Sequence, residues 1–116
     1  MLSPEHRELI ESVDSTFQSD VEPERDQVKA AVKSILAQLS RIEPGRSVEL
    51  RIPPYAAIQL VAGHTHRRGT PAAVVETDAR TLVALAVGSL TWVDAIAKGV
   101  LIAGGERSDL SRLFPL

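Results

Sequence analysis

The most regular pattern of apolar positions along the chain lies between residues 28 and 39. Its members recur at helical spacing: Val28, Ala31, Val32, Ile35, Leu36 and Leu39. This spacing places all six side chains on one face of a helix. The pattern therefore predicts an amphipathic helix that begins at Pro23 and ends before Pro44-Gly45, where a proline–glycine pair favours a turn.

A thinner apolar stripe comes earlier in the chain. Ser3-Pro4-Glu5 combines a cap residue, a proline at the first helical position and an acid in the first turn, which is typical of a helix start. Ile10, Val13 and Phe17 follow at helical spacing, and a polar break spans residues 18–22. We expect residues 1–20 to form a helical appendage that buries little, and residues 21–116 to form the core of a single domain.

The period changes to two between Ser47 and Ile52, where apolar and polar residues alternate. Alternation is typical of a strand with one buried and one solvated face. Pro53-Pro54 ends this strand, and residues 57–62 and 72–77 predict two more. Three consecutive strands with short connections favour a meander.

Residues 78–103 predict two short helices followed by a returning strand. Asp78 stands at a helix N-cap, and Gly88 suits the left-handed position that ends a helix. Thr91 caps the second helix, and Gly99 ends it. The apolar stripes of the two helices are Leu82, Leu85 and Ala86 in the first, and Trp92, Ala95 and Ile96 in the second.

The remainder of the chain completes the expected fold. Residues 100–103 form a short apolar run that suits a fourth strand, and Ser108 is expected to cap a final helix. Leu110, Leu113 and Phe114 would share one face of that helix. This order of elements predicts an α+β fold, with a small, mostly antiparallel sheet of about four to five strands covered on one face by helices.

Composition narrows the class of protein. The chain has 116 residues, a net charge of −2 and no cysteine, which excludes disulfides, thiolate metal sites and cysteine nucleophiles. No apolar run approaches the ~18 residues of a membrane helix, and the polar N-terminus is unlike a signal peptide. We therefore expect a cytoplasmic protein. Nucleic acid is not an expected partner, because no stripe of basic residues is interleaved with aromatic ones.

Few residues suggest chemistry. His64 and His66 lie two apart but lack a third ligand close by, so neither a metal nor a cofactor is expected. Arg67 and Arg68 either are solvated or contact a lipid headgroup. Glu76 and Asp78 resemble an acid pair, but Asp78 already has the capping role. No nucleophile motif or phosphate-binding loop is present, so we expect no enzyme.

A set of apolar residues on facing elements has two interpretations. They form either a packed core or the lining of an apolar tunnel, and composition does not separate the two. The set comprises Ile58, Leu60, Leu82, Leu85, Trp92, Ile96, Ile102, Leu110, Leu113 and Phe114.

The segment from Gly88 to Gly104, GSLTWVDAIAKGVLIAG, resembles the C-terminal half of the sterol carrier protein 2 family. The segments RGTP (68–71), VVETD (74–78) and DLSRLFPL (109–116) are similar to a bacterial, actinobacterial-type branch of that family. The resemblance covers residues 26–116. It implies non-covalent binding of a fatty acid, acyl-CoA, phospholipid or sterol, in a cavity lined by the apolar set above. Arg67 and Arg68 would then face the headgroup.

The resemblance also carries an alternative function. Similar domains occur at the C-terminal end of mycothiol-dependent maleylpyruvate isomerase-like enzymes, where a separate helical domain binds the metal. The chain would then be an accessory module that docks onto a protein partner.

Overall fold

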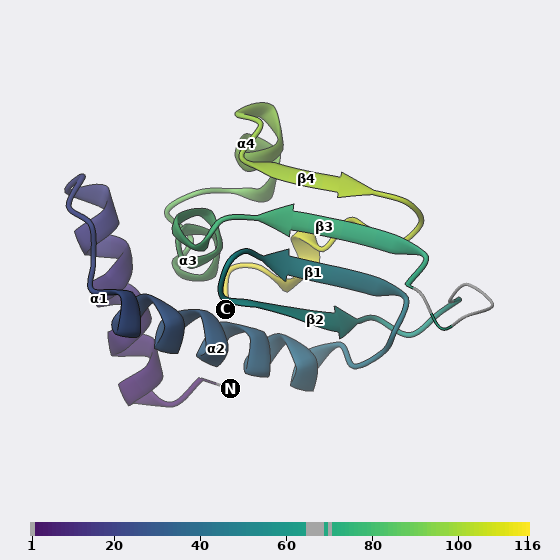
Figure 1. Cartoon of the computed structure of the whole chain (residues 1–116), viewed down its shortest axis with the longest axis horizontal. Coiled ribbons are helices and arrows are strands. Elements are labelled where there is room, and N and C mark those ends of the chain that lie inside the picture. Colours follow the sequence, from purple (N-terminus) through teal and green to yellow (C-terminus); the bar gives the residue numbers. More distant parts are fainter. Residues whose placement is uncertain (1, 65–68, 70) are drawn as a thin grey trace.

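The computed structural model describes residues 2–64, 69 and 71–116. Two long helices come first, three strands follow, and two short helices precede a last strand and a 3-10 turn (Figure 1). The elements are α1 (Pro4–Gln18), α2 (Arg25–Ile42), β1 (Val48–Ile52), β2 (Ala56–Leu60), β3 (Ala73–Thr77), α3 (Ala79–Val87), α4 (Trp92–Ala97), β4 (Leu101–Gly104) and η1 (Ser111–Leu113). The predicted α+β class is confirmed.

The four strands form one mixed sheet in the order β2-β1-β3-β4 (Figure 1). β1 pairs with β2 and β3 pairs with β4 in antiparallel fashion, whereas β1 and β3 are parallel. The predicted meander is therefore wrong. Val48 lies between Leu60 at the end of β2 and Ala73 at the start of β3, so β2 and β3 lie on opposite sides of β1.

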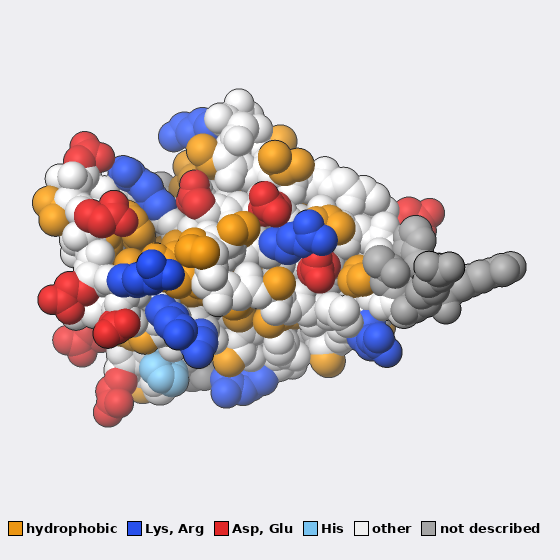
Figure 2. Space-filling view, viewed as in Figure 1, with side chains coloured by type: hydrophobic (Ala, Val, Ile, Leu, Met, Phe, Trp, Pro, Cys, Tyr) orange, Lys and Arg blue, Asp and Glu red, His pale blue; other side chains and the backbone are white. Residues whose placement is uncertain are grey.

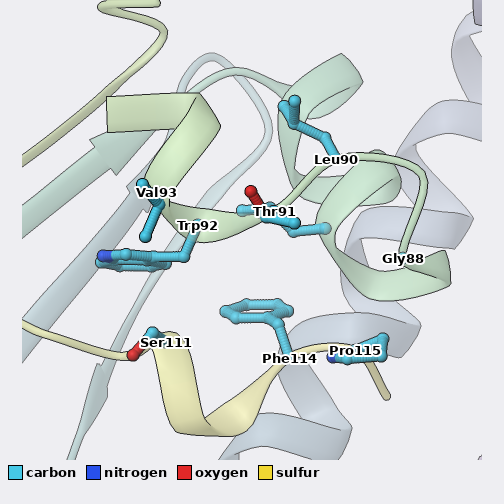
Figure 3. Close-up of a pocket in the computed structure, with 9 residues that line it drawn as sticks. Gly88, Leu90, Thr91, Trp92, Val93, Ser111, Phe114 and Pro115 are labelled. Carbon is cyan, nitrogen blue, oxygen red and sulfur yellow. The ribbon is translucent and has the colours of Figure 1, made fainter. Parts of the chain in front are cut away.

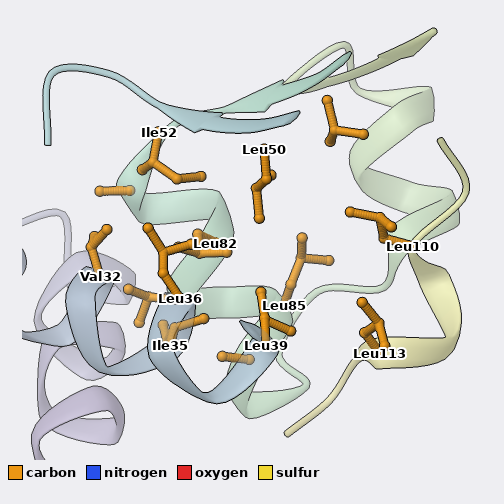
Figure 4. Close-up of a cluster of buried hydrophobic side chains, with 14 of the residues drawn as sticks. Val32, Ile35, Leu36, Leu39, Leu50, Ile52, Leu82, Leu85, Leu110 and Leu113 are labelled. Carbon is orange, nitrogen blue, oxygen red and sulfur yellow. The ribbon is translucent and has the colours of Figure 1, made fainter. Parts of the chain in front are cut away.

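The alternation of β1 and β3 separates the two faces of the sheet. Val48, Leu50 and Ile52 are buried, whereas Glu49 and Arg51 lie on the opposite face, where they form an ion pair. The buried face packs against α2, α3 and η1 in one continuous apolar cluster (Figure 4). Most of the space between sheet and helices is thus filled by side chains.

The caps predicted between the sheet and the short helices are confirmed. The Asp78 carboxylate accepts a hydrogen bond from the Thr81 N–H at 2.7 Å, and the Thr91 hydroxyl accepts one from the Asp94 N–H at 3.1 Å. Gly88 has a φ of 88°, as expected for a left-handed C-cap. These local bonds satisfy donors that a helix start leaves free.

The first helix contributes more to the core than its thin stripe suggests. Ile10, Val13 and Phe17 are all buried, and α1 packs on α3 and α2. The expectation that this helix buries little is therefore wrong. Three apolar residues suffice because α1 crosses α3, whose own side chains are apolar on several faces.

The final helix predicted after Ser108 is also wrong. The structure has only the 3-10 turn η1, which begins at Ser111 and ends before Phe114. Asp109, rather than Ser108, accepts a hydrogen bond from the Ser111 N–H. Pro115 follows two residues after this turn and supplies no backbone N–H, so the segment cannot extend into a regular helix.

Candidate functional site

The candidate site is an apolar pocket of about 300 Å³ between the α3–α4 turn and the C-terminal segment (Figure 3). One wall follows the chain from the end of α3 to the first turn of α4. The other wall is η1 and the residues after it. The lining residues are Leu85, Gly88, Leu90, Thr91, Trp92, Val93, Ser111, Phe114 and Pro115.

Two aromatic rings, one from each wall, face one another in this pocket (Figure 3). The centroids of Trp92 and Phe114 are 6.2 Å apart, and their planes are inclined by 21°. This distance lies within the range of ~4.5–7 Å over which aromatic pairs attract one another. Both side chains remain partly exposed, so they are available to a molecule that enters the pocket.

Local backbone bonds position the first wall. Gly88 ends α3 in the left-handed conformation, and the N–H groups of Gly88, Ser89 and Leu90 all donate to the Ala84 carbonyl. The chain then turns sharply to Thr91, whose cap begins α4. Trp92 is therefore the first residue of α4, held at the edge of the helix layer.

The second wall is fastened to the end of α3. The Leu116 N–H donates to the Ala86 carbonyl at 2.9 Å. Pro115 lies close to Gly88, where a β-carbon would come within 3.5 Å of it. Arg112 in η1 also forms an ion pair with Glu43 at the end of α2, with a nitrogen–oxygen distance of 3.1 Å.

The pocket has few polar groups. The Thr91 hydroxyl already serves as the α4 cap. Hydrogen bonds from the Ser111 side chain, and then from its backbone N–H, hold the pKa of Asp109 below its ordinary value, because both favour the ionised carboxylate. Asp109 lies outside the lining. The chemistry that the arrangement supports is hydrophobic contact and ring stacking.

The predicted apolar set divides into three groups. Leu85, Trp92 and Phe114 meet at the pocket. Four others are buried in the core and Ile58 is partly buried against it; the four are Leu60, Leu82, Leu110 and Leu113.

Two members of the set do not lie in the helix–sheet interior. Ile96 is 42% exposed, because the buried side of the short helix α4 is occupied by Ala95. Ile102 is 68% exposed and lies on the opposite face of the sheet, next to Glu76 in register. The expectation that these two line an interior cavity is wrong.

Six lining residues lie outside the predicted set, and the three with large apolar side chains are Leu90, Val93 and Pro115. Leu90 and Val93 flank the Thr91-Trp92 helix start, so their proximity to Trp92 was available as a signal. Pro115 follows Phe114 directly, but only the folded chain shows that it reaches Gly88.

Among the residues that the structure describes, the other candidates do not line this pocket. His66, Arg67 and Arg68 lie outside the described residues, so their predicted roles stay predictions. Glu76 is exposed on the outer face of the sheet, and Asp78 caps α3. Among the described residues, no group of three or more His, Cys, Asp or Glu side chains is arranged to hold a metal.

A wider depression of about 510 Å³ lies on the outer face of the sheet. It is lined by Ala72, Ala73, Val74, Glu76, Ile102, Gly104 and Gly105, and it is more open than the pocket at Trp92. Its volume is larger because the sheet face there is uncovered, and the described residues form no second wall that would enclose a ligand. We therefore take the aromatic pocket as the candidate site.

The family comparison matches residues 24–116 to the model described as bacterial SCP ortholog. This match spans most of the chain, including every element from α2 to η1. The chain belongs to the bacterial SCP ortholog family. No curated protein gives a significant match.

Membership confirms the resemblance found in the sequence. The pocket lies wholly within the matched region, whereas α1 lies before it. None of the helices in the described part of the chain is long and apolar enough to cross a membrane.

Proposed function

We propose that this SCP ortholog is a non-enzymatic protein that binds the acyl chain, or another apolar part, of a lipid in the pocket between Trp92 and Phe114. The observation that carries the proposal is the pairing of two partly exposed aromatic rings across an apolar pocket within the family-matched region. Ligand pockets are typically concave and mostly apolar, with few polar groups. This pocket has that character.

The size of the pocket narrows the class of ligand. About 300 Å³ is the lower end of the range of ~300–1,000 Å³ that ligand sites usually occupy. The proposed occupant is therefore a short acyl chain or the end of a longer one, with the remainder of the lipid outside. A fatty acid, acyl-CoA or phospholipid satisfies this condition more readily than a sterol, whose rigid ring system enters as a whole.

Hydrophobic burial would supply most of the binding energy, at ~25 cal/mol per Å² of apolar surface removed from water. Part of this gain is offset by the loss of freedom of the ligand. Hydrogen bonds fix the chain segments that carry Trp92 and Phe114 on each side of the pocket, which reduces the ordering cost on the protein side.

The test uses Trp92, the only tryptophan in the chain, as reporter. Dodecanoate should change its fluorescence in a saturable way. Val93→Phe enlarges a side chain that lines the pocket and is 73% exposed, and it should abolish the response without lowering the melting temperature. The matched control is Val21→Phe, at an exposed valine of the α1–α2 connection.

Two results decide the proposal. A saturable response in the parent and in Val21→Phe, but not in Val93→Phe, supports it. A parent protein that shows no response, and that yields no lipid on extraction with organic solvent after purification, contradicts it.

A different observation favours the second candidate, an accessory module that docks onto a protein. Within the described residues, seven large apolar side chains are exposed, and five of them lie on β3, α4 and β4 or between them. These five are Val74, Val93, Ile96, Val100 and Ile102. Charged side chains are interspersed with apolar ones over the visible face (Figure 2). A protein without extractable lipid and without a Trp92 response would favour this alternative.

A further inference from the structure

The pocket walls are tied to a helix that lies outside the family-matched region. α1 ends at Gln18, and the match begins at residue 24. Two of its side chains nevertheless form hydrogen bonds with the two segments that make the pocket walls. Asp14 bonds with the α3–α4 turn, and Arg7 bonds with the C-terminal segment. α1 therefore contacts both walls of the pocket, although it lies far from them in the sequence.

Asp14 is a buried acid, only 7% exposed. Its carboxylate accepts one hydrogen bond from the Ser89 hydroxyl, whose oxygen lies 3.2 Å from Oδ1 and 3.1 Å from Oδ2, and one from the Gln18 amide at 3.4 Å. The ion pairs found among the described residues are Arg51–Glu49, Arg80–Asp20 and Arg112–Glu43. Among the described residues, the hydrogen-bond donors to the Asp14 carboxylate are therefore a hydroxyl and an amide, and none is a charged side chain.

A buried carboxylate is costly unless its hydrogen bonds are made, and bonds to a charged acceptor are stronger than those between neutral groups. The Asp14–Ser89 contact therefore restrains the turn more firmly than a contact between neutral side chains would. Ser89 lies directly between Gly88 and Leu90, both of which line the pocket. It is three residues before Trp92.

The other wall has a second tie. The Arg7 guanidinium donates to the Leu116 carbonyl oxygen at 3.2 Å, and the Leu116 N–H donates to Ala86 at the end of α3. Phe114 and Pro115 are the two residues before Leu116 and line the pocket. The same helix thus contacts both chain segments that carry the facing rings.

We propose that α1 is a positioning element for the pocket, with Asp14 as its main positioning residue: its hydrogen bonds to Ser89 hold the α3–α4 turn so that Trp92 faces Phe114. This inference rests on the proposed function for the identity of the ligand, but not for the position of Trp92. Loss of the bond frees the turn, exposes Trp92 and weakens binding of an acyl chain.

The experiment compares Asp14→Ala, Ser89→Ala and the double variant with the parent. Two readouts are measured well below the melting temperature: quenching of Trp92 fluorescence by acrylamide, and affinity for dodecanoate. Quenching should rise in all three variants. Affinity should fall about five-fold, the effect expected of one lost hydrogen bond, and the double variant should lose no more than the single ones.

Matched controls separate positioning from general stability. Glu11→Ala removes an exposed acid from the same helix, and Ser34→Ala removes a serine whose hydroxyl donates to the Ala30 carbonyl of its own helix. Neither should change the quenching. Asp14→Asn keeps the size of the side chain and an oxygen acceptor for Ser89 but removes the charge, so its quenching should lie between that of the parent and that of Asp14→Ala. Ser89→Ala, which removes the same bond from the other partner, serves as the test variant if Asp14→Ala fails to fold.

The outcomes distinguish this inference from the proposed function. Increased quenching in the Asp14 and Ser89 variants, with no dodecanoate binding even in the parent, supports the positioning role and contradicts lipid binding. Saturable binding in the parent, together with quenching and affinity that are unchanged in both single variants, overturns the positioning role and leaves lipid binding intact.

Discussion

At the scale of single residues, capping residues fix the ends of the two short helices beside the pocket. The side chains of Asp78 and Thr91 each accept a hydrogen bond from a backbone N–H that the start of a helix leaves without a partner. Gly88 allows α3 to end in a left-handed turn. These roles depend on neighbours in the sequence, so local reasoning identifies them well. The bond between Asp14 and Ser89 has no such local signal, since the two residues are 75 positions apart.

The two adjacent glycines at the end of β4, Gly104 in the strand and Gly105 after it, provide a residue-scale prediction. Gly105 has a φ of 97°, and a β-carbon there would lie 2.7 Å from the Ala72 carbonyl oxygen, whereas one on Gly104 would meet nothing within 4 Å. Gly105→Ala should therefore lower the free energy of unfolding by about 1–3 kcal/mol. Gly104→Ala should change it by less than about 1 kcal/mol. Urea denaturation measures both, and equal effects would contradict the close approach at Gly105.

At the scale of elements, the sequence predicted most helices and strands but not the order of the strands. The stripe of α2 and the alternation of β1 depend on local periodicity, which survives in the fold. Strand order depends on which strands have a neighbour on both sides. β1 and β3 alternate fully between buried and exposed positions and are central, whereas only Leu60 is buried in β2, which lies at an edge. These burial patterns belong to the folded chain, and the sequence of β2 is as apolar as that of β3, so the sequence alone did not exclude a meander.

The candidate site was likewise predictable only in part. Trp92 and Phe114 were identified as large apolar groups on facing elements, and the structure brings them together. Periodicity did not separate Leu85 at the pocket from Leu82 in the core, because both are apolar and belong to one helix. It also misplaced Ile96, because Ala95 is the residue that α4 buries.

The first helix provides the element-scale prediction. Ile10 is one of the largest fully buried side chains, and α1 packs on α3. Ile10→Ala should lower the free energy of unfolding by about 2–5 kcal/mol, the usual cost of such a cavity in a core. The exposed neighbour Glu11 is the control, since Glu11→Ala should stay within ~0.5 kcal/mol of the parent. Urea denaturation with a small loss for Ile10→Ala would restore the view that residues 1–20 are an appendage.

At the scale of the whole molecule, one apolar cluster joins residues from every part of the chain. It runs from Leu2 through α1, α2 and the sheet to Leu113 in η1. The C-terminal segment closes back on α3 through Leu116 and on α1 through Arg7. The pocket is therefore not a separate module, because its walls are extensions of the same packed cluster.

This continuity predicts that the protein unfolds in a single cooperative transition. Small domains with one core usually do so, and probes of different regions then report the same midpoint. Circular dichroism at 222 nm reports mainly α1 and α2, which hold most of the helical residues, whereas fluorescence reports Trp92 at the pocket. Thermal curves from the two probes should coincide. In Ile10→Ala both should shift together to lower temperature, because α1 and the pocket share the core. An early loss of ellipticity with unchanged Trp92 emission would show instead that α1 unfolds independently, and that the pocket keeps its shape without it.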